Sequence, residues 1–180
     1  MRGTILFNFF LLLGSCCFSS SVFASPTNAN PLVSGILSYT AWNTPLEELN
    51  FCIIDGPAKF ITQNIFSPPS PLIRPQSIKI IQIDSNNLLT ESAHFNQNTC
   101  HVLYFANTVD VTQQKVLQGD LKKHLTISEQ NADCAIGSTF CLYKNADHFS
   151  FKVNLTSLKR SNVRVNSKVL MLANPEGSPK

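Results

Sequence analysis

The residues best suited to chemistry in this sequence are its six cysteines. Cysteine side chains form disulfides, bind metals or react as thiolates, and their spacing helps to decide among these roles. The sequence has no C-x-x-C motif, which argues against an oxidoreductase of the thioredoxin type. The six positions are Cys16, Cys17, Cys52, Cys100, Cys134 and Cys141.

The four histidines do not combine with these cysteines into a recognisable metal site. No two histidines have the i, i+4 spacing of a helical site. Cys100 and His101 are adjacent, but neighbouring side chains of a strand point to opposite faces. We therefore predict no metal and no cofactor, and we assign structural roles to the histidines. They are His94, His101, His124 and His148.

Other catalytic and nucleic-acid-binding signatures are absent from the sequence. It contains no G-x-S-x-G, H-E-x-x-H, P-loop or G-x-G-x-x-G motif, and its aspartates form no evident acid–base pair. The 180 residues carry a net charge of only +3. The basic residues form nothing longer than the pairs Lys122-Lys123 and Lys159-Arg160, so we predict no nucleic-acid partner.

Residues 1–24 have the character of a secretory signal peptide. Arg2 supplies the positive charge, residues 5–13 form an apolar core, and small residues precede a cleavage point after Ala24. The apolar run is shorter than the roughly 20 residues that span a bilayer. An alternative is a lipid anchor at Cys16, where the sequence loosely resembles a lipobox. Export leaves four cysteines in an oxidising compartment and predicts disulfides.

The pattern of apolar residues predicts one α/β domain over residues 31–174. We expect a mixed sheet of five to six short strands flanked by helices, a flexible tail over 25–30 and a polar C-terminal tail over 175–180. The expected strands are 49–54, 78–83, 100–105, 125–128, and a hairpin of 140–143 with 149–153. The expected helices are 31–42, which includes Tyr39 and Trp42, then 58–66, 108–117 and one capped by Asn154, with an apolar element at 169–173.

Three passages of the chain together resemble the YfiR family of exported proteins from Gram-negative bacteria. The first runs from Ile36 to Trp42 and continues at Leu49 to Gly56. The second is Cys100-His101-Val102-Leu103-Tyr104-Phe105, and the third spans residues 137–173. The chain departs from the family in its proline-rich stretch at 67–75 and at Gly137-Ser138, where many relatives carry two glycines.

The resemblance implies a periplasmic regulator and not an enzyme. Proteins of this family bind the periplasmic sensor domain of an inner-membrane diguanylate cyclase and hold the cyclase inactive, which lowers cyclic di-GMP and biofilm formation. An outer-membrane lipoprotein can sequester the repressor. The implied fold is a compact α/β domain that is often dimeric and contains disulfides.

The four mature cysteines permit three pairings, and the sequence alone does not choose among them. Proximity favours Cys134–Cys141, with Gly137 supplying the chain reversal. Cys52 and Cys100 lie in apolar strands that could be neighbours, and the family pattern supports the same pairing. One disulfide is expected to act as a redox-sensitive switch; the alternative is that both disulfides only stabilise the fold. Exposure predicted from the polar surroundings makes Cys134–Cys141 the better switch.

A partner surface is expected where apolar residues lie near the two ends of the domain. Each of these residues is equally compatible with the core. The candidates are Tyr39, Trp42, Leu170, Met171 and Leu172. An alternative function is a periplasmic small-ligand module, with a crevice at the strand edge that carries Asp55-Gly56-Pro57. A third alternative, a thiol oxidoreductase, requires free mature cysteines.

Overall fold

The computed structural model describes residues 27–66, 77–84, 86, 99–106, 123–130, 133–134, 137–146 and 148–173. The predicted signal peptide, the helix at 108–117 and the tail at 175–180 lie outside these residues. Within the described part, no helix is long and apolar enough to cross a bilayer.

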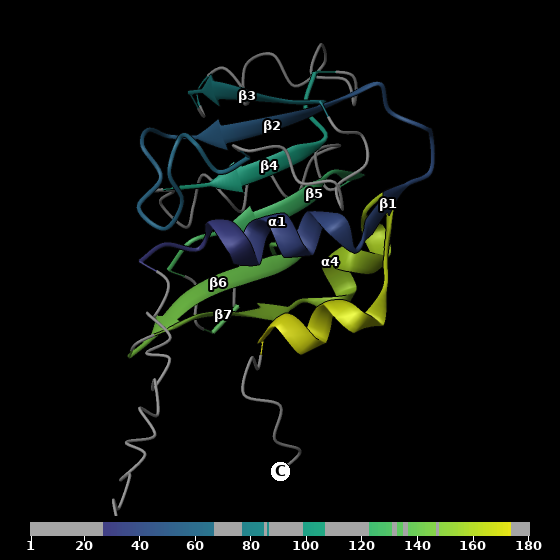
Figure 1. Ribbon diagram of the computed structural model, residues 1–180. Helices are drawn as coiled ribbons and strands as arrows, with labels where there is room; N and C mark the ends of the chain where they lie inside the picture. The colour runs from purple at the N-terminus through teal and green to yellow at the C-terminus, as the bar shows by residue number, and fades with distance from the viewer. Residues whose placement is uncertain are drawn as a thin grey trace, which may run out of the picture.

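A six-stranded mixed sheet forms the centre of the molecule, in the order β3-β2-β4-β5-β6-β7. The first five strands in that order run parallel, and β7 pairs antiparallel with β6 (Figure 1). β4 and β5 are buried along their whole length, as expected of parallel strands covered on both faces. The predicted α/β fold with a mixed sheet is therefore confirmed. The strands are β2 (Glu48–Ile54), β3 (Ser77–Ile83), β4 (Val102–Phe105), β5 (Leu125–Ser128), β6 (Phe140–Asn145) and β7 (His148–Val153).

Helix α1 (Asn30–Ser38) lies across one face of this sheet (Figure 1). Pro31 sits in its first turn, where a missing backbone N–H costs nothing. The buried stripe of Leu32, Val33, Ile36 and Leu37 joins the main core on that face. The flexible tail predicted for 25–30 is wrong at its end, because Ala29 is fully buried and its N–H donates to the Phe60 carbonyl.

The helix predicted to reach Trp42 ends at Ser38 instead. Strand β1 (Thr40–Trp42) follows and pairs antiparallel with β8 (Val163–Val165) in a separate two-stranded sheet. The Thr40 hydroxyl donates to the Ile36 carbonyl and so satisfies an acceptor at the helix end. The partner strand is more than 120 residues away in the sequence, which is why helical spacing alone gave the wrong end point.

A second, smaller core lies on the other face of the sheet. Side chains alternate along β2, so Phe51 and Ile53 join the main core, whereas Cys52 and Ile54 face the opposite side. There they pack with a further set of buried and half-buried residues. These are Cys100, Leu103, Phe105, Ile81 and Ile83.

The short elements after the hairpin follow the prediction, but the segment after β2 does not. Asn154 caps α4 (Leu155–Arg160) by accepting the Ser157 N–H at 3.0 Å. The apolar C-terminal element is the 3-10 helix η2 (Ser167–Ala173), with Val169 buried. Residues 58–66 form turns and not the predicted helix. Two backbone N–H groups at the start of that segment donate to the Glu129 carboxylate in place of helical carbonyls.

Candidate functional site

The four cysteines that were predicted to form disulfides do so with the expected pairing. Cys52 is bonded to Cys100, with 5.8 Å between their Cα atoms, and Cys134 is bonded to Cys141, with 5.4 Å. Cys52 and Cys100 are both fully buried in the smaller core. The first bridge therefore ties β2 to the residues that lead into β4, where thiols and reductants have little access.

The second disulfide is more accessible and lies beside helix α4. Cys141 is fully buried on β6, but Cys134 is half-buried. Within the described part of the intervening loop, the left-handed residue is Cys134, with φ of 55°, and not Gly137 as predicted. Gly137 has a different role: a Cβ there would lie 3.1 Å from Ser157 Oγ, which donates a hydrogen bond to the Gly137 carbonyl.

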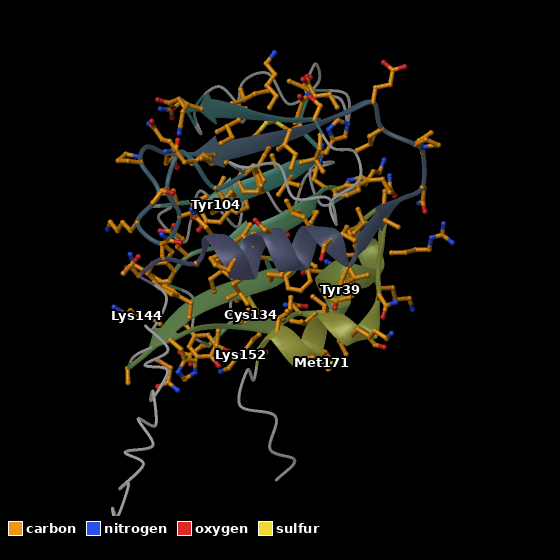
Figure 2. The ribbon with its side chains drawn as sticks, viewed as in Figure 1. Tyr39, Tyr104, Cys134, Lys144, Lys152 and Met171 are labelled. Carbon is orange, nitrogen blue, oxygen red and sulfur yellow. A yellow bond between two sulfur atoms is a disulfide. The ribbon has the colours of Figure 1, made fainter. Side chains whose placement is uncertain are left out.

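The five candidate partner-binding residues divide into two groups. Tyr39, Trp42 and Leu172 are half-buried and pack against the main core. Leu170 and Met171 are 55% and 72% exposed on η2. Tyr39 and Met171 lie toward the same end of the molecule (Figure 2), where η2 packs against α1 and β7.

Sequence reasoning missed a third exposed apolar residue, which lies on a different element from η2. Leu155 is the first residue of α4 and is 73% exposed. The sequence carries no clear signal for this exposure, because single apolar residues are common on protein surfaces. The exposed apolar side chains of the described C-terminal elements are thus Leu155, Leu170 and Met171.

An open cleft occupies the edge of the sheet where the alternative hypothesis expected a ligand crevice. It has a volume of about 950 Å³ and lies at the carboxyl ends of β2 and β3. Asp55, Gly56 and Pro57 line it together with Gln82 and Asp84. Asp55 and Gly56 have left-handed φ values of 62° and 95°, so the chain turns sharply away from the sheet as β2 ends.

A buried carboxylate, also missed from the sequence, organises the neighbouring part of this edge. Glu129 follows β5, is only 8% exposed, and accepts hydrogen bonds from the Tyr104 hydroxyl and from the N–H groups of Lys59 and Phe60. Burial, followed by the charge and hydrogen bond of Glu129, raises the pKa of Tyr104 far above its usual value. The hydroxyl therefore stays protonated and serves as a permanent donor.

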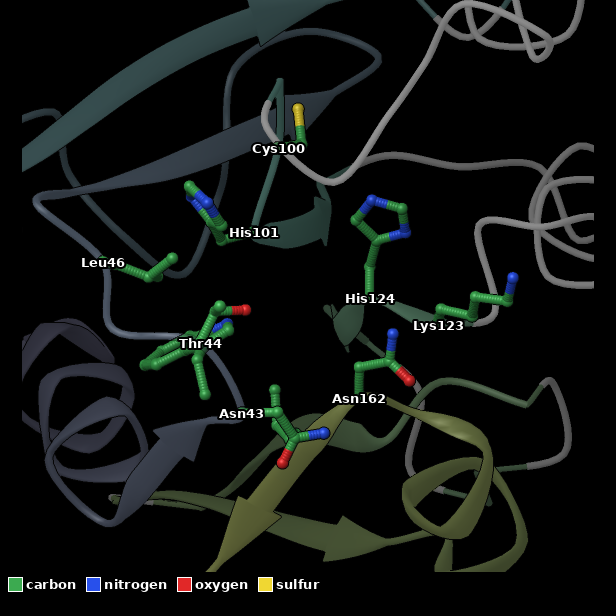
Figure 3. Close-up of a pocket in the computed structure, with 10 residues that line it drawn as sticks. Asn43, Thr44, Leu46, Cys100, His101, Lys123, His124 and Asn162 are labelled. Carbon is green, nitrogen blue, oxygen red and sulfur yellow. The ribbon is translucent and has the colours of Figure 1, made fainter.

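Two of the predicted structural histidines line a smaller cavity at the opposite edge of the sheet. His101 precedes β4 and His124 precedes β5 (Figure 3). Nδ1 of His101 accepts the Asn50 N–H at 2.8 Å, and burial lowers the pKa of this imidazole. Among the described residues, no three metal-ligating side chains come together, so neither histidine belongs to such a group.

Comparison with known families agrees with this architecture. A sequence model described as YfiR/HmsC-like matches residues 29–174, from the buried Ala29 to the end of η2. The match covers most of the chain and includes both disulfides. Proteins of this kind are periplasmic, non-catalytic regulators in diguanylate cyclase systems. This chain is therefore a member of the YfiR/HmsC-like family.

Proposed function

We propose that this protein binds the periplasmic sensor domain of an inner-membrane diguanylate cyclase and represses it. The observation that carries the proposal is the family match over residues 29–174. Repression requires that the protein bind the inactive cyclase conformation more tightly than the active one. The proposed outcome is lower cyclic di-GMP and less biofilm.

The exposed apolar surface of η2 is the proposed docking element. Leu170 and Met171 face solvent, whereas Val169 of the same helix faces the core and is only 3% exposed. The Ser150 hydroxyl also donates to the Ala173 carbonyl at 2.8 Å, which ties the end of η2 to β7. A docking segment that is already rigid loses little conformational entropy on binding. The firm anchoring of η2 thus supports its role as a recognition surface.

Charge supports an acidic partner surface at this end of the molecule. Residues 137–173 contain six basic residues and one acidic residue. Residues 25–136 contain six basic and nine acidic residues, so the two parts of the mature chain have opposite net charges. Complementary charge speeds association and disfavours wrong orientations. The basic residues are Lys144, Lys152, Lys159, Arg160, Arg164 and Lys168.

The Cys134–Cys141 bridge is the proposed redox-sensitive switch. Its loop contacts α4 through the hydrogen bond between Ser157 and Gly137. Reduction would free the half-buried Cys134 and loosen this support for α4. Cys52–Cys100 is fully buried and is proposed to brace the fold. An outer-membrane lipoprotein that competes for the η2 surface, and a homodimer, are further proposed partners.

The direct test combines nucleotide measurement with binding of purified proteins. Deleting the gene should raise cellular cyclic di-GMP, and the mature protein should bind the periplasmic domain of the cyclase in biolayer interferometry. Leu170→Asp and Met171→Asp should weaken binding at least tenfold. Asn145→Asp is the control, because it adds the same negative charge at an exposed position on β6, away from η2, and should leave binding unchanged. Unchanged nucleotide levels together with no binding would refute the proposal.

A small-ligand-binding function is the second candidate, and the 950 Å³ cleft beside Asp55 favours it. Ligand sites of α/β sheets occur at the carboxyl ends of the strands. Thermal-shift screening of the mature protein with amino acids, nucleotides and sugars tests this function. A stabilising ligand whose effect is lost in Gln82→Ala supports it, and a screen without any stabilising compound argues against it.

A further inference from the structure

Helix η2 carries the one methionine that the mature chain retains. The sequence contains two methionines, Met1 and Met171, and Met1 is removed with the predicted signal peptide. The Met171 side chain is 72% exposed. Its thioether sulfur is therefore open to small reagents in solution, unlike the sulfur of a methionine packed in a core.

The other sulfur atoms of the mature chain are held in disulfides. Cys52 is bonded to Cys100, and Cys134 is bonded to Cys141. No thiol of these four residues is left to react first with a mild oxidant, whereas a thioether takes up oxygen reversibly to give methionine sulfoxide. In the disulfide-bonded protein, Met171 is thus the sulfur site at which a two-electron oxidant reacts most readily.

The geometry of η2 separates the exposed methionine from the packed side of the same helix. In a 3-10 helix, side chains three residues apart lie above one another. Val169 and Leu172 form the inward row, since Val169 is buried and Leu172 packs on Gly35 of α1. Lys168 and Met171 form an outward row, and both are exposed. A polar oxygen added to Met171 would face solvent and leave the packing of η2 intact.

We propose that Met171 is an oxidation site through which hydroperoxides weaken the docking of η2 to the cyclase domain, an inference that rests on the proposed function. The sulfur lone pair attacks the terminal oxygen of the hydroperoxide, so that an S–O bond forms and the O–O bond breaks. Sulfur loses two electrons. The leaving oxygen takes the proton of the attacked oxygen and departs as water or an alcohol.

The sulfoxide changes the chemistry of the docking surface at its most exposed point. Its oxygen is a hydrogen-bond acceptor, and burying it against a partner costs free energy unless the partner supplies a donor. Affinity for the cyclase domain should therefore fall while the fold persists. Binding and oxidation also oppose each other reciprocally, because a bound cyclase domain would cover Met171. This site responds to oxidants, whereas the Cys134–Cys141 bridge responds to reductants.

The oxidation site is tested first without the partner. Mature protein from the periplasm is treated with hydrogen peroxide, and oxygen uptake is followed by intact and peptide mass spectrometry. We expect one oxygen atom per chain, on Met171, at a rate within about threefold of that of free N-acetylmethionine amide, with an unchanged urea midpoint. A rate more than about tenfold below this reference, or unfolding on oxidation, would overturn the proposal.

Binding to the periplasmic cyclase domain is then compared by biolayer interferometry. The oxidised protein should bind at least fivefold more weakly, and treatment with methionine sulfoxide reductases should restore binding. Met171→Leu should bind like the native protein and be insensitive to peroxide, because leucine has a similar volume and no sulfur. The matched control is Met171→Leu/Asn145→Met, which moves the methionine to an exposed position on β6, where its oxidation should leave binding unchanged.

The outcomes separate this inference from the proposed function. Equal binding of the native and the oxidised protein would overturn the inference alone, as would weaker binding of peroxide-treated Met171→Leu. An excess of bound cyclase domain that does not slow the oxidation of Met171 would place this residue outside the interface and would also overturn it. No binding by the unoxidised protein would refute the proposed function, and the inference with it.

Discussion

The Tyr104 hydroxyl donates a 2.7 Å hydrogen bond to Oε1 of Glu129. The same carboxylate accepts the Phe60 N–H at 2.8 Å and the Lys59 N–H at 2.9 Å. One buried carboxylate therefore holds together strand β4, the end of β5 and the segment that follows β2. These contacts fix the carboxyl edge of the sheet beside the Asp55 cleft.

Removing this carboxylate should destabilise the protein strongly. We expect Glu129→Ala to lower the free energy of unfolding by about 2–3 kcal/mol, because it leaves three donors without their charged acceptor. Tyr104→Phe should lower it by about 1–2 kcal/mol, since only one hydrogen bond is lost. Urea unfolding followed by circular dichroism measures both. Glu47→Ala, at an exposed carboxylate, is the control and should change stability by less than about 0.5 kcal/mol.

The imidazole of His101 should make the fold sensitive to mild acid. Burial lowers the pKa of His101 in the folded state, so below pH 6.5, the ordinary pKa of histidine, the unfolded chain binds a proton more readily than the folded chain. The stabilisation is complete above pH 6.5 and is lost as the pH falls through the lower, folded-state pKa. Protonation of Nδ1 would also break its hydrogen bond with the Asn50 N–H.

Urea midpoints measured between pH 4.5 and 8 check this expectation. The midpoint of the native protein should fall as the medium becomes more acidic than pH 6.5. His101→Gln keeps a possible acceptor for Asn50 but does not titrate, so its midpoint should depend less on pH in this range. Identical pH profiles for the two proteins would contradict the assignment to His101.

The two disulfides should differ both in stability contribution and in ease of reduction. Cys52–Cys100 joins residues 48 apart in sequence, and loop entropy predicts a contribution of about 4 kcal/mol. Cys134–Cys141 joins residues 7 apart and should contribute about 2.5 kcal/mol. The half-buried Cys134 should be reduced first, because Cys52 and Cys100 are both inaccessible to a reductant.

Timed reduction with dithiothreitol, followed by alkylation and peptide mass spectrometry, measures this order. Alkylated Cys134 and Cys141 should appear while Cys52 and Cys100 remain bridged. The paired variants Cys134→Ala/Cys141→Ala and Cys52→Ala/Cys100→Ala provide the stability comparison in urea. Simultaneous reduction of both disulfides in the folded protein would argue against a selective redox-sensitive switch.

The sequence predicted correctly those elements whose local residue pattern agrees with the partners that they find in the fold. Strand β5 has the predicted bounds, Leu125–Ser128, and Asn154 caps α4 as expected. The helix end at Ser38 and the turns at 58–66 were missed because their partners are distant in sequence. Thr40–Trp42 pairs with β8, and Lys59 donates to a carboxylate 70 residues away. A distant strand or carboxylate outweighs the weak helical preference of such short segments.

The same distinction applies to the candidate site. The disulfide pairing was predicted because proximity in the sequence favours Cys134–Cys141 and the family pattern supports the same pairing. Only some of the predicted partner residues are exposed, because the sequence of an apolar run does not show which of its side chains face solvent. Leu170 and Met171 face solvent, whereas Leu172 in the same run packs onto α1 at Gly35. A 3-10 helix turns these three neighbours in different directions.

The Leu172 side chain of η2 packs closely against Gly35 of α1. A Cβ at Gly35 would lie 2.6 Å from Leu172 Cδ1, which is too close for both atoms to remain in place. Gly35→Ala should therefore displace Leu172 and, with it, the exposed Leu170 and Met171. Because alanine also favours the helix by about 1 kcal/mol, α1 itself should persist. We expect weaker binding to the cyclase domain without global unfolding.

A partner-independent measurement separates this displacement from the proposed function. Met171 is the only methionine besides Met1, so its ¹³C-methyl resonance reports on η2 alone. Gly35→Ala should shift this resonance, and Gly35→Ala/Leu172→Val should return it toward the native position, because valine lacks the Cδ atoms that the new methyl group meets. A native Met171 resonance in Gly35→Ala would mean that Leu172 moves without η2, and the docking surface would then not depend on this contact.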